Sequence, residues 1–324
     1  MISCAIVGAT GLVGSTILKV LEEKKLNIDE YYLYASSRSV GKKIKFMEKE
    51  YEIKELTEEA PLKKFTYAIF AAGGEISEKY AKAFINNDTI VIDNSSKFRM
   101  DPEVPLVVPE INIKDAYDSK LIANPNCSTI QAVVALAPLH KQYRIKRIVY
   151  STYQAVSGAG TSGLQDLIET SVGNKPKKFP YKIYNNCIPH IDSFLDNGYT
   201  KEEEKMIKET KKVLKDPTID ITATCVRVPV FNSHAESINV SFEDEFDIEN
   251  LRQLLANSPG VAVLDDTSRN IYPLNTFATS KDDVFVGRLR KDYSIKNGLN
   301  MWVVSDNVRK RCRYKCSTNI RRYY

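Results

Sequence analysis

Short apolar runs alternate with amphipathic stretches over the first third of the chain. The runs predict buried strands at residues 2–7, 31–36, 67–72 and 89–94, with shorter strands near 106–109 and 121–124. Apolar residues at helical spacing predict helices at residues 12–25 and 76–86. Strands that alternate with helices form a parallel sheet covered by helices. This part of the chain therefore predicts an α/β domain with a parallel sheet.

The pattern changes after residue 127. Longer runs of alternating apolar and polar residues predict strands at 146–156, 219–230, 235–243, 284–292 and 299–305. Helical spacing recurs at residues 128–143, 161–171, 200–215 and 247–257, whereas residues 173–199 form a long irregular segment. We therefore expect a second, α+β domain with a mixed or antiparallel sheet.

The helix predicted at 200–215 carries two local signals. Thr200 is followed three residues later by Glu203, which is the pattern of a capping box. Charged residues run from Lys201 to Lys215, so we expect a largely solvent-exposed helix.

Composition narrows the class of protein. The 324 residues, 43% of them hydrophobic, can bury the cores of two domains. The formal net charge of +5 is contributed entirely by residues 311–324, which hold five basic residues and no acid. Residues 1–310 carry no net charge, so no nucleic-acid partner is expected. Because neither a membrane span nor a secretory signal is apparent, we expect a cytoplasmic protein without a membrane partner. Six scattered cysteines and three histidines predict no metal site.

A glycine-rich turn links the first predicted strand to the first helix. The segment reads GATGLVG and contains the candidate cofactor residues Gly8, Thr10, Gly11, Leu12, Val13 and Gly14. Backbone N–H groups and the helix dipole hold a dinucleotide pyrophosphate at such a turn. The spacing is a variant of the usual fingerprint, and a tight packing turn is the alternative. We favour a Rossmann-like nucleotide site.

The end of the second predicted strand indicates which dinucleotide is bound. An enzyme that uses NAD places an acidic residue there for the ribose hydroxyls. This chain has Ser36, Arg38 and Ser39 instead. Arginine and hydroxyl groups suit a 2′-phosphate, so we expect NADP, with a solvated turn as the alternative.

Cys127 lies in the segment ANPNCST, at the junction of a predicted strand and a helix. Unsatisfied N–H groups at a helix start favour the thiolate, which is the reactive form. The alternative is a small buried hydrophobe, as most free cysteines are.

Other polar residues could act together with a thiolate and a bound nucleotide. Gln154 ends a predicted strand and precedes Ser157 and Gly158, two further candidate cofactor residues in a loop flexible enough to approach a ligand closely. His234 lies at the start of a predicted strand, where it could exchange protons with Cys127 and with a substrate. A structural role is the alternative for each. Two arginines that suggest a substrate with two anionic ends are Arg99, after a strand, and Arg227, within an apolar strand.

The chain up to about residue 310 resembles the aspartate-semialdehyde dehydrogenase family. The matching motifs are GATGLVG, ASSRSVGK, DNSSKFRMD, ANPNCST, the Gln154 segment with SGAG, EEEKM and RVPVFNSHAE. The resemblance implies reversible, NADPH-dependent reductive dephosphorylation of L-4-aspartyl phosphate to L-aspartate 4-semialdehyde by a homodimer. This reaction lies on the route to lysine (through diaminopimelate), methionine, threonine and isoleucine.

The resemblance also implies roles for individual residues. Cys127 would carry the acyl thioester, His234 would be the acid/base, and Gln154 would orient the substrate. Arg227 and Glu202 would hold its amino-acid end, whereas Arg99 and Lys205 would receive the phosphate. Physical reasoning adds that Asn126 and the N–H groups at the helix start could stabilise the tetrahedral oxyanion.

The resemblance ends near residue 310. The family continues with a Gly-Ala-rich helix, whereas residues 311–324 are basic, and we hypothesise a shifted reading frame there. We expect an NADP-binding domain at 1–126, completed by 306–324, and a catalytic and dimerisation domain at 127–305. The alternatives are an N-acetyl-gamma-glutamyl-phosphate reductase, which shares the thioester chemistry, and a nucleotide-binding redox sensor without turnover.

Overall fold

The structure, a computed structural model, describes residues 1–310. It consists of two compact units, which meet in sequence between Pro125 and Asn126. The hypothesis about residues 311–324 lies outside the described residues. Of the segment 306–324, which was expected to complete the first domain, the described residues 306–310 belong to the second unit.

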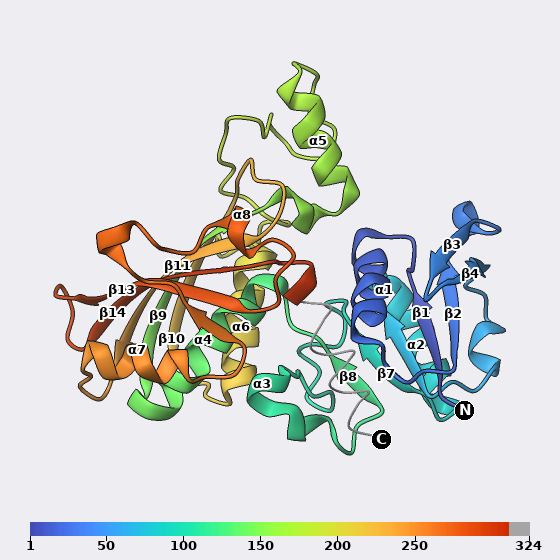
Figure 1. The fold of residues 1–324 in the computed structure, drawn as a ribbon, viewed down its shortest axis with the longest axis horizontal. Coiled ribbons are helices and arrows are strands. Elements are labelled where there is room, and N and C mark those ends of the chain that lie inside the picture. The colour runs from blue at the N-terminus through green and yellow to red at the C-terminus, as the bar shows by residue number, and fades with distance from the viewer. Residues whose placement is uncertain (311–324) are drawn as a thin grey trace. The chain divides into compact units, whose positions relative to one another are not determined.

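The first unit is built on a six-stranded sheet in the order β5-β2-β1-β6-β7-β8, and each adjacent pair of strands is parallel (Figure 1). Its strands are β1 (Ser3–Val7), β2 (Glu30–Ala35), β5 (Lys54–Glu55), β6 (Tyr67–Phe70), β7 (Ile90–Asp93) and β8 (Leu121–Ala123). The helices are α1 (Leu12–Lys24), α2 (Gly74–Asn86) and the short α3 (Pro109–Asn112). The prediction of a parallel α/β sheet is confirmed.

Three details of the first unit differ from the sequence prediction, the first being the short strand β5, which was not predicted. A hairpin of β3 (Lys43–Phe46) and β4 (Lys49–Glu52) follows β2, where no strands were predicted. Its Lys- and Glu-rich strands are largely exposed, so they lack a strong apolar alternation. The strand predicted near 106–109 is reduced to an isolated bridge between Leu106 and Ala123. Proline has no backbone N–H for a ladder, and Pro109 starts α3 instead.

The second unit has a mixed six-stranded sheet in the order β10-β9-β11-β14-β13-β12. Its strands are β9 (Ile145–Gln154), β10 (Asp220–Arg227), β11 (His234–Phe242), β12 (Val261–Val263), β13 (Val284–Asp292) and β14 (Gly298–Ser305). β9 is parallel to β10 and antiparallel to β11, so the predicted mixed sheet is confirmed.

Three helices pack beside this sheet and beside one another. They are α4 (Cys127–Tyr143), α6 (Lys201–Leu214) and α7 (Ile248–Ala256). The predicted capping box is present, because Thr200 accepts a hydrogen bond from the N–H of Glu203, whose carboxylate accepts one from the N–H of Thr200. The prediction of a largely solvent-exposed α6 is wrong on one face. Glu202, Glu203 and Glu209 are buried there because each carboxylate has hydrogen-bond donors.

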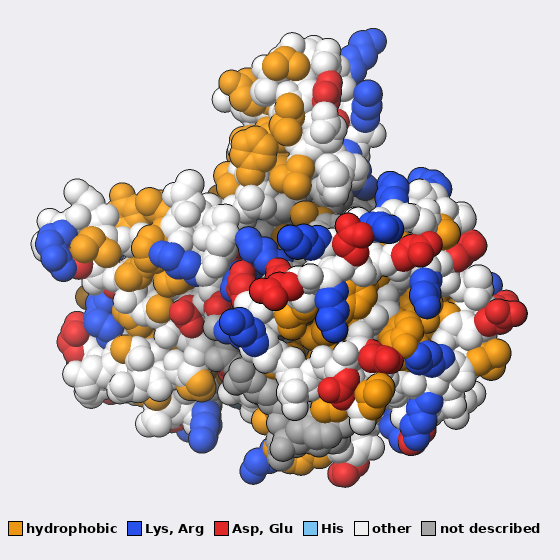
Figure 2. Space-filling model, turned by 45° about the vertical axis from the view of Figure 1, so that its right-hand side comes forward, with side chains coloured by type: hydrophobic (Ala, Val, Ile, Leu, Met, Phe, Trp, Pro, Cys, Tyr) orange, Lys and Arg blue, Asp and Glu red, His pale blue; other side chains and the backbone are white. Residues whose placement is uncertain are grey.

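The irregular segment predicted at 173–199 is confirmed as free of helices and regular strands, apart from isolated bridges. It follows α5 (Thr161–Ser171), and together they form the lobe at the top of Figure 1. Apolar side chains gather on the surface of this lobe (Figure 2). Its exposed apolar residues are Ile168, Val172, Tyr181, Tyr184 and Phe194. Within residues 1–310, no helix is long and apolar enough to cross a membrane.

Candidate active site

The glycine turn of the first unit lies between β1 and α1. Gly8 has a φ of +86°, and a Cβ atom at this position would lie 2.9 Å from the backbone of Ala71. A Cβ atom on Gly14 would likewise overlap the backbone of Gly8. Gly11 is the N-cap of α1 and offers no side-chain acceptor to the first-turn N–H groups. Thr10, Leu12 and Val13 complete the turn and the helix start, so the residues present fit a bound pyrophosphate.

The candidate 2′-phosphate residues follow β2, the strand next to β1 in the sheet. Ser36 precedes a short 3₁₀ turn over Ser37–Ser39, and the side chain of Arg38 is exposed. The hydroxyl oxygens of Thr10 and Ser39 lie 3.4 Å apart. The glycine turn and the second strand end are therefore neighbours, as a dinucleotide site requires.

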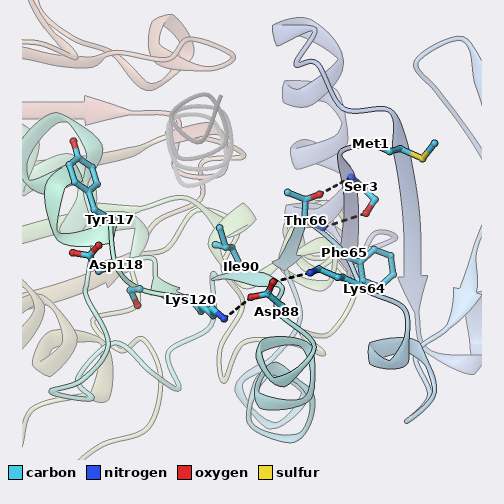
Figure 3. Close-up of a pocket in the computed structure, with 11 residues that line it drawn as sticks. Met1, Ser3, Lys64, Phe65, Thr66, Asp88, Ile90, Tyr117, Asp118 and Lys120 are labelled. Carbon is cyan, nitrogen blue, oxygen red and sulfur yellow. Dashed lines mark hydrogen bonds and ion pairs between the residues drawn. The ribbon is translucent and has the colours of Figure 1, made fainter.

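Arg99 belongs to the first unit and follows β7. Its side chain is buried, and one of its terminal nitrogens donates a hydrogen bond to the carbonyl of Asn94 at 3.0 Å. A pocket of about 560 Å³ in the same unit lies elsewhere (Figure 3). It is lined by Ser3, Ile90 and Lys120 at the amino ends of strands, the edge opposite to the glycine turn. Ligands of such sheets bind at the carboxyl edge. This pocket is therefore not the candidate nucleotide site.

In the second unit, Cys127 is the first residue of α4 and is buried. The preceding Asn126 caps the helix, and its side-chain oxygen accepts hydrogen bonds from the N–H groups of Ser128 at 2.9 Å and Thr129 at 3.4 Å. The prediction that Cys127 lies in the first helical turn is confirmed. Two of the first-turn N–H groups are already bonded to Asn126, so they are not free to stabilise an oxyanion.

Two glutamates of α6 accept hydrogen bonds from Asn126. Its backbone N–H donates to Glu209 at 2.6 Å, and its side-chain amide donates to Glu202 at 2.9 Å. Glu202 and Glu209 are seven residues apart, so they lie on one helical face. Sequence analysis did not identify Glu209, although this spacing could have indicated it.

His234, the first residue of β11, meets Cys127. Its Nε2 atom lies 3.4 Å from the Cys127 sulfur, and its Nδ1 atom faces the backbone N–H of Ala155, with 3.0 Å between the nitrogens. Its carbonyl accepts a hydrogen bond from the side-chain amide of Gln131 at 3.3 Å. Burial, followed by the charge of Arg227, lowers the pKa of His234 well below its usual range. Burial thus favours the neutral imidazole.

Gln154 ends β9, and its side chain, like that of Asn126, hydrogen-bonds to the Glu202 carboxylate. Its side-chain amide donates to Glu202 at 3.1 Å, and Lys205 donates to the second oxygen of Glu202 at 3.2 Å. Burial raises the pKa of Glu202, but Lys205 and the two amide groups outweigh it, so the net shift is downward. Lys205 also donates to Asp192 at 2.6 Å. A phosphate on Lys205 would therefore compete with two carboxylates.

Arg227 ends β10 beside Gln154, its register partner on β9. Its guanidinium is buried and donates to the carbonyl of Ala155 at 2.7 Å. Burial lowers the pKa of Arg227, whereas the charge of Glu202 opposes that shift. The two side chains thus present opposite charges in a buried setting, which suits a substrate with both a carboxylate and an ammonium group.

The Ser157–Gly158 segment lies against the same cluster. A Cβ atom on Gly158 would be 2.8 Å from the guanidinium of Arg227 and 3.2 Å from the His234 ring. The Ser157 hydroxyl donates to the side-chain oxygen of Asn307 at 3.2 Å, and that oxygen also accepts the N–H of Ser233. Sequence analysis missed Asn307, which ties this segment to the residue before His234.

The structure thus brings together every candidate residue of the second unit. They are Asn126, Cys127, Gln154, Ser157, Gly158, Glu202, Lys205, Arg227 and His234. Those of the first unit gather at its glycine turn and strand ends. Within residues 1–310, no group of three or more His, Cys, Asp or Glu side chains is placed to hold a metal ion.

Glu236 is a buried acid that sequence analysis also missed, two residues after His234 on β11. Burial raises its pKa well above the usual range, and the nearby amide of Gln131 offsets part of that shift. The native state keeps a proton that the unfolded state loses near pH 4.5, so its contribution to stability is lost as the pH rises through the native pKa.

We therefore expect Glu236→Gln to remove a pH-dependent destabilisation. Above about pH 5, the free energy of unfolding of the parent protein should fall relative to the variant, by up to about 1.4 kcal/mol per pH unit. Denaturant unfolding of both proteins at about pH 5.5 and about pH 8 measures this difference. An equal difference at both pH values would contradict the buried neutral acid.

Comparison with known proteins identifies the class of this arrangement. The profile of the semialdehyde dehydrogenase NAD-binding domain matches residues 3–119, and that of the semialdehyde dehydrogenase dimerisation domain matches residues 136–310. Because these two matches cover most of the chain, they place it among the semialdehyde dehydrogenases, and the contacting cysteine and histidine are consistent with this class.

Relatives define the family more closely. Aspartate-semialdehyde dehydrogenase of Aquifex aeolicus is 52% identical over 94% of this chain and 93% of its own length. The crystal structure of aspartate semialdehyde dehydrogenase II from Vibrio cholerae has a TM-score of 0.91 and 42% identity, covering 99% of this chain and 97% of that one. The chain belongs to the aspartate-semialdehyde dehydrogenase family. These comparisons support neither of the two alternative functions.

Proposed function

We propose that this protein catalyses the reversible, NADPH-dependent reductive dephosphorylation of L-4-aspartyl phosphate to L-aspartate 4-semialdehyde. The observation that carries the proposal is the contact of 3.4 Å between the Cys127 sulfur and His234, at a helix start, in a chain of this family. The Vibrio cholerae enzyme has also been solved in complex with ASA, with the same TM-score of 0.91. We place the reaction in the cytoplasm, where thiols stay reduced.

The reaction starts with attack of the Cys127 thiolate on the acyl carbon. A carbon–sulfur bond forms, the acyl–oxygen bond breaks, and phosphate leaves with the bonding electron pair. We assign Arg99 and Lys205 to the phosphate. The substrate carboxylate then pairs with Arg227 and its ammonium group with Glu202, while Gln154 orients the acyl group. The second hydrogen of the Asn126 amide is a candidate donor to the oxyanion.

Reduction of the thioester completes the cycle. The residues of the glycine turn would hold NADPH, and the cofactor would supply a hydride to the thioester carbon. The resulting hemithioacetal oxyanion collapses, the carbon–sulfur bond breaks, and the aldehyde leaves while Cys127 returns to the thiolate. The overall reaction takes up one proton, which goes to the released phosphate.

The test of this function is an assay in the oxidative direction. Aspartate semialdehyde, phosphate and NADP should together give NADPH, and omission of phosphate should stop its formation. N-acetylglutamate semialdehyde is the matched comparison, because it is the substrate of the alternative reductase. Faster turnover of that compound, or none with either, would overturn the proposal.

We propose NADP as the cofactor on the basis of Arg38 and the hydroxyl groups of Ser36 and Ser39. A charge-assisted hydrogen bond contributes about 1.5–3 kcal/mol, so Arg38→Ala should raise KM for NADP about 10- to 150-fold and leave KM for NAD nearly unchanged. Steady-state kinetics with both cofactors measures the ratio. Lys49→Ala, which removes an exposed cation of β4 in the same unit, is the control. An unchanged ratio would remove Arg38 from the cofactor site.

We propose a homodimer formed through the second unit, which matches the dimerisation domain. The sheet face away from α4 presents Tyr153, Ser237 and Trp302, with the two aromatic rings 5.4 Å apart. Ser237→Arg places a charge between these neighbouring strands, so we expect monomers in analytical ultracentrifugation with unchanged circular dichroism. Lys208→Glu, on an exposed position of α6, should leave the dimer intact. A dimeric Ser237→Arg variant would contradict the proposed face.

A further inference from the structure

The helix α4 contacts His234 at two points, one helical turn apart. In the first turn, the Cys127 sulfur lies 3.4 Å from Nε2 of the His234 ring. One turn further on, the side-chain amide of Gln131 donates a hydrogen bond to the His234 carbonyl at 3.3 Å. Residues four apart lie on one face of a helix. The face of α4 that carries the nucleophile therefore also holds the backbone of the histidine.

The other end of the Gln131 amide is held by β14. Its oxygen accepts a hydrogen bond from the Ser305 hydroxyl at 2.8 Å. Ser305 is the register partner of His234, and all three residues are fully buried. A carbonyl only accepts hydrogen bonds, so the amide nitrogen must face His234 and the amide oxygen Ser305. One side chain thus connects α4 to the residue that begins β11 and to the residue that ends β14.

The surroundings of Gln131 on α4 are apolar. Residues 130 and 132–134 are buried aliphatic residues. Burial of an amide costs free energy, which its hydrogen bonds offset with little surplus. An apolar side chain of similar volume would therefore pack at this position about as well. This points to a role of the amide in the geometry of its partners and not in the stability of the helix.

The chain enters His234 through an unusual backbone conformation. Ser233 has a φ of +70°, in the left-handed region that residues other than glycine rarely adopt. Because β11 begins at His234, strand pairing restrains this residue only on its carboxyl-terminal side. The bond from Gln131 to its carbonyl adds a restraint towards α4.

We propose that Gln131 is a positioning residue, whose amide holds the His234 backbone against α4 and so sets the separation between the His234 ring and the Cys127 sulfur. Gln131 acts through His234 and takes no part in bond making. The inference rests on the proposed function for the reaction that the pair carries out, but the contact itself needs no substrate.

Glu236 is the competing partner of the Gln131 amide. It lies two residues after His234 on the same face of β11, and the nearby amide favours its ionised form. If Gln131 served Glu236 alone, loss of the amide would change the stability of the fold but leave the contact between Cys127 and His234 intact. The two roles therefore predict different results.

Gln131→Met removes the amide at nearly constant volume. Without the bond to its carbonyl, His234 can shift relative to Cys127, and a displacement of about 1 Å at a reacting group costs about 10²-fold. In the phosphate-dependent assay we expect kcat to fall about 10- to 100-fold. KM for aspartate semialdehyde should stay within about twofold of the parent, because Arg227 and Glu202 keep their positions. A kcat within about twofold of the parent, or a loss confined to KM, would overturn the inference.

Ser305→Ala is a milder variant that keeps Gln131. It removes only the hydroxyl group that holds the amide oxygen, so kcat should fall about three- to tenfold, again with little change in KM. Thr210→Val is the matched control, because it removes a buried hydroxyl of α6 that lies 3.1 Å from the Tyr150 hydroxyl on β9. That helix–sheet contact does not involve His234, so kcat should match the parent. Equal kcat values in Ser305→Ala and Thr210→Val would contradict the proposed bridge.

Thiol alkylation tests the contact without any substrate. A neighbouring imidazole activates a cysteine, so iodoacetamide at neutral pH should modify Cys127 more slowly in Gln131→Met than in the parent, as followed by peptide mass spectrometry. In a His234→Ala background, Gln131→Met should cause no further decrease, because the group through which it acts is absent. Equal decreases in the two backgrounds, or no decrease in the parent background, would overturn the inference.

The outcomes separate this inference from the proposed function. Coupling between Gln131 and His234 in the alkylation rate, without turnover of aspartate semialdehyde, would overturn the function and leave the positioning role standing. Turnover by Gln131→Met at the parent kcat would overturn the positioning role alone.

Discussion

Replacement of Cys127 by serine is expected to abolish turnover. A serine hydroxyl does not ionise at neutral pH, so the position facing His234 would hold no anionic nucleophile. We expect kcat/KM for aspartate semialdehyde to fall by at least about 10³-fold, as for other covalent nucleophiles. NADPH formation in the phosphate-dependent assay measures the loss.

Two controls separate a loss of catalysis from a loss of folding. Cys187→Ser removes an exposed thiol outside the cluster and should leave turnover unchanged. Cys127→Ser itself should unfold at the temperature of the parent protein and still bind NADP, because the substitution is nearly isosteric. A Cys127→Ser protein with more than about a tenth of the parent activity would exclude the thioester mechanism.

Gly158→Ala is the second substitution with a large expected effect. Its methyl group would lie 2.8 Å from the Arg227 guanidinium and 3.2 Å from the His234 ring, so one of the two must move. A displacement of about 1 Å at a reacting group costs about 10²-fold, and we expect a loss of that order in kcat/KM. The same kinetic assay, with the melting temperature recorded in parallel, checks it.

Gly173→Ala is the matched control for that substitution. Gly173 has a φ of +93°, and a Cβ atom there would meet no atom within 4 Å. This variant should lose about 1 kcal/mol of stability through backbone strain and keep its activity. If Gly158→Ala lowered stability alone, as Gly173→Ala should, the close approach of Gly158 to His234 would have no catalytic meaning.

Strong periodicity made most elements of the fold predictable. The helix predicted at 161–171 spans Thr161–Ser171, and the strand predicted at 235–243 begins one residue earlier, at His234. Weak periodicity explains what was missed. The β3–β4 hairpin carries Lys and Glu on exposed strands, and it turns through Met47 and Glu48 at positive φ without the Asn or Gly that normally signals such a turn.

The buried acids show a different limit of prediction from sequence. A run of charges predicts an exposed helix, yet Glu202, Glu203 and Glu209 are buried on α6. Their donors come from other elements: Asn126 before α4, Gln154 on β9 and the N–H of Cys225 on β10. Burial of a charge depends on such partners, which lie far away in the sequence.

The sequence by itself determined the element types, the glycine turn and the chemical groups available for catalysis, because these follow from local periodicity and side-chain identity. The tertiary structure alone decided which atoms meet. Cys127 and His234 are 107 positions apart in the chain, and only strand pairing and helix packing bring the sulfur to 3.4 Å from Nε2. The contact at the other ring nitrogen is decided in the same way, by a backbone N–H that every residue except proline possesses and that only the fold directs at Nδ1.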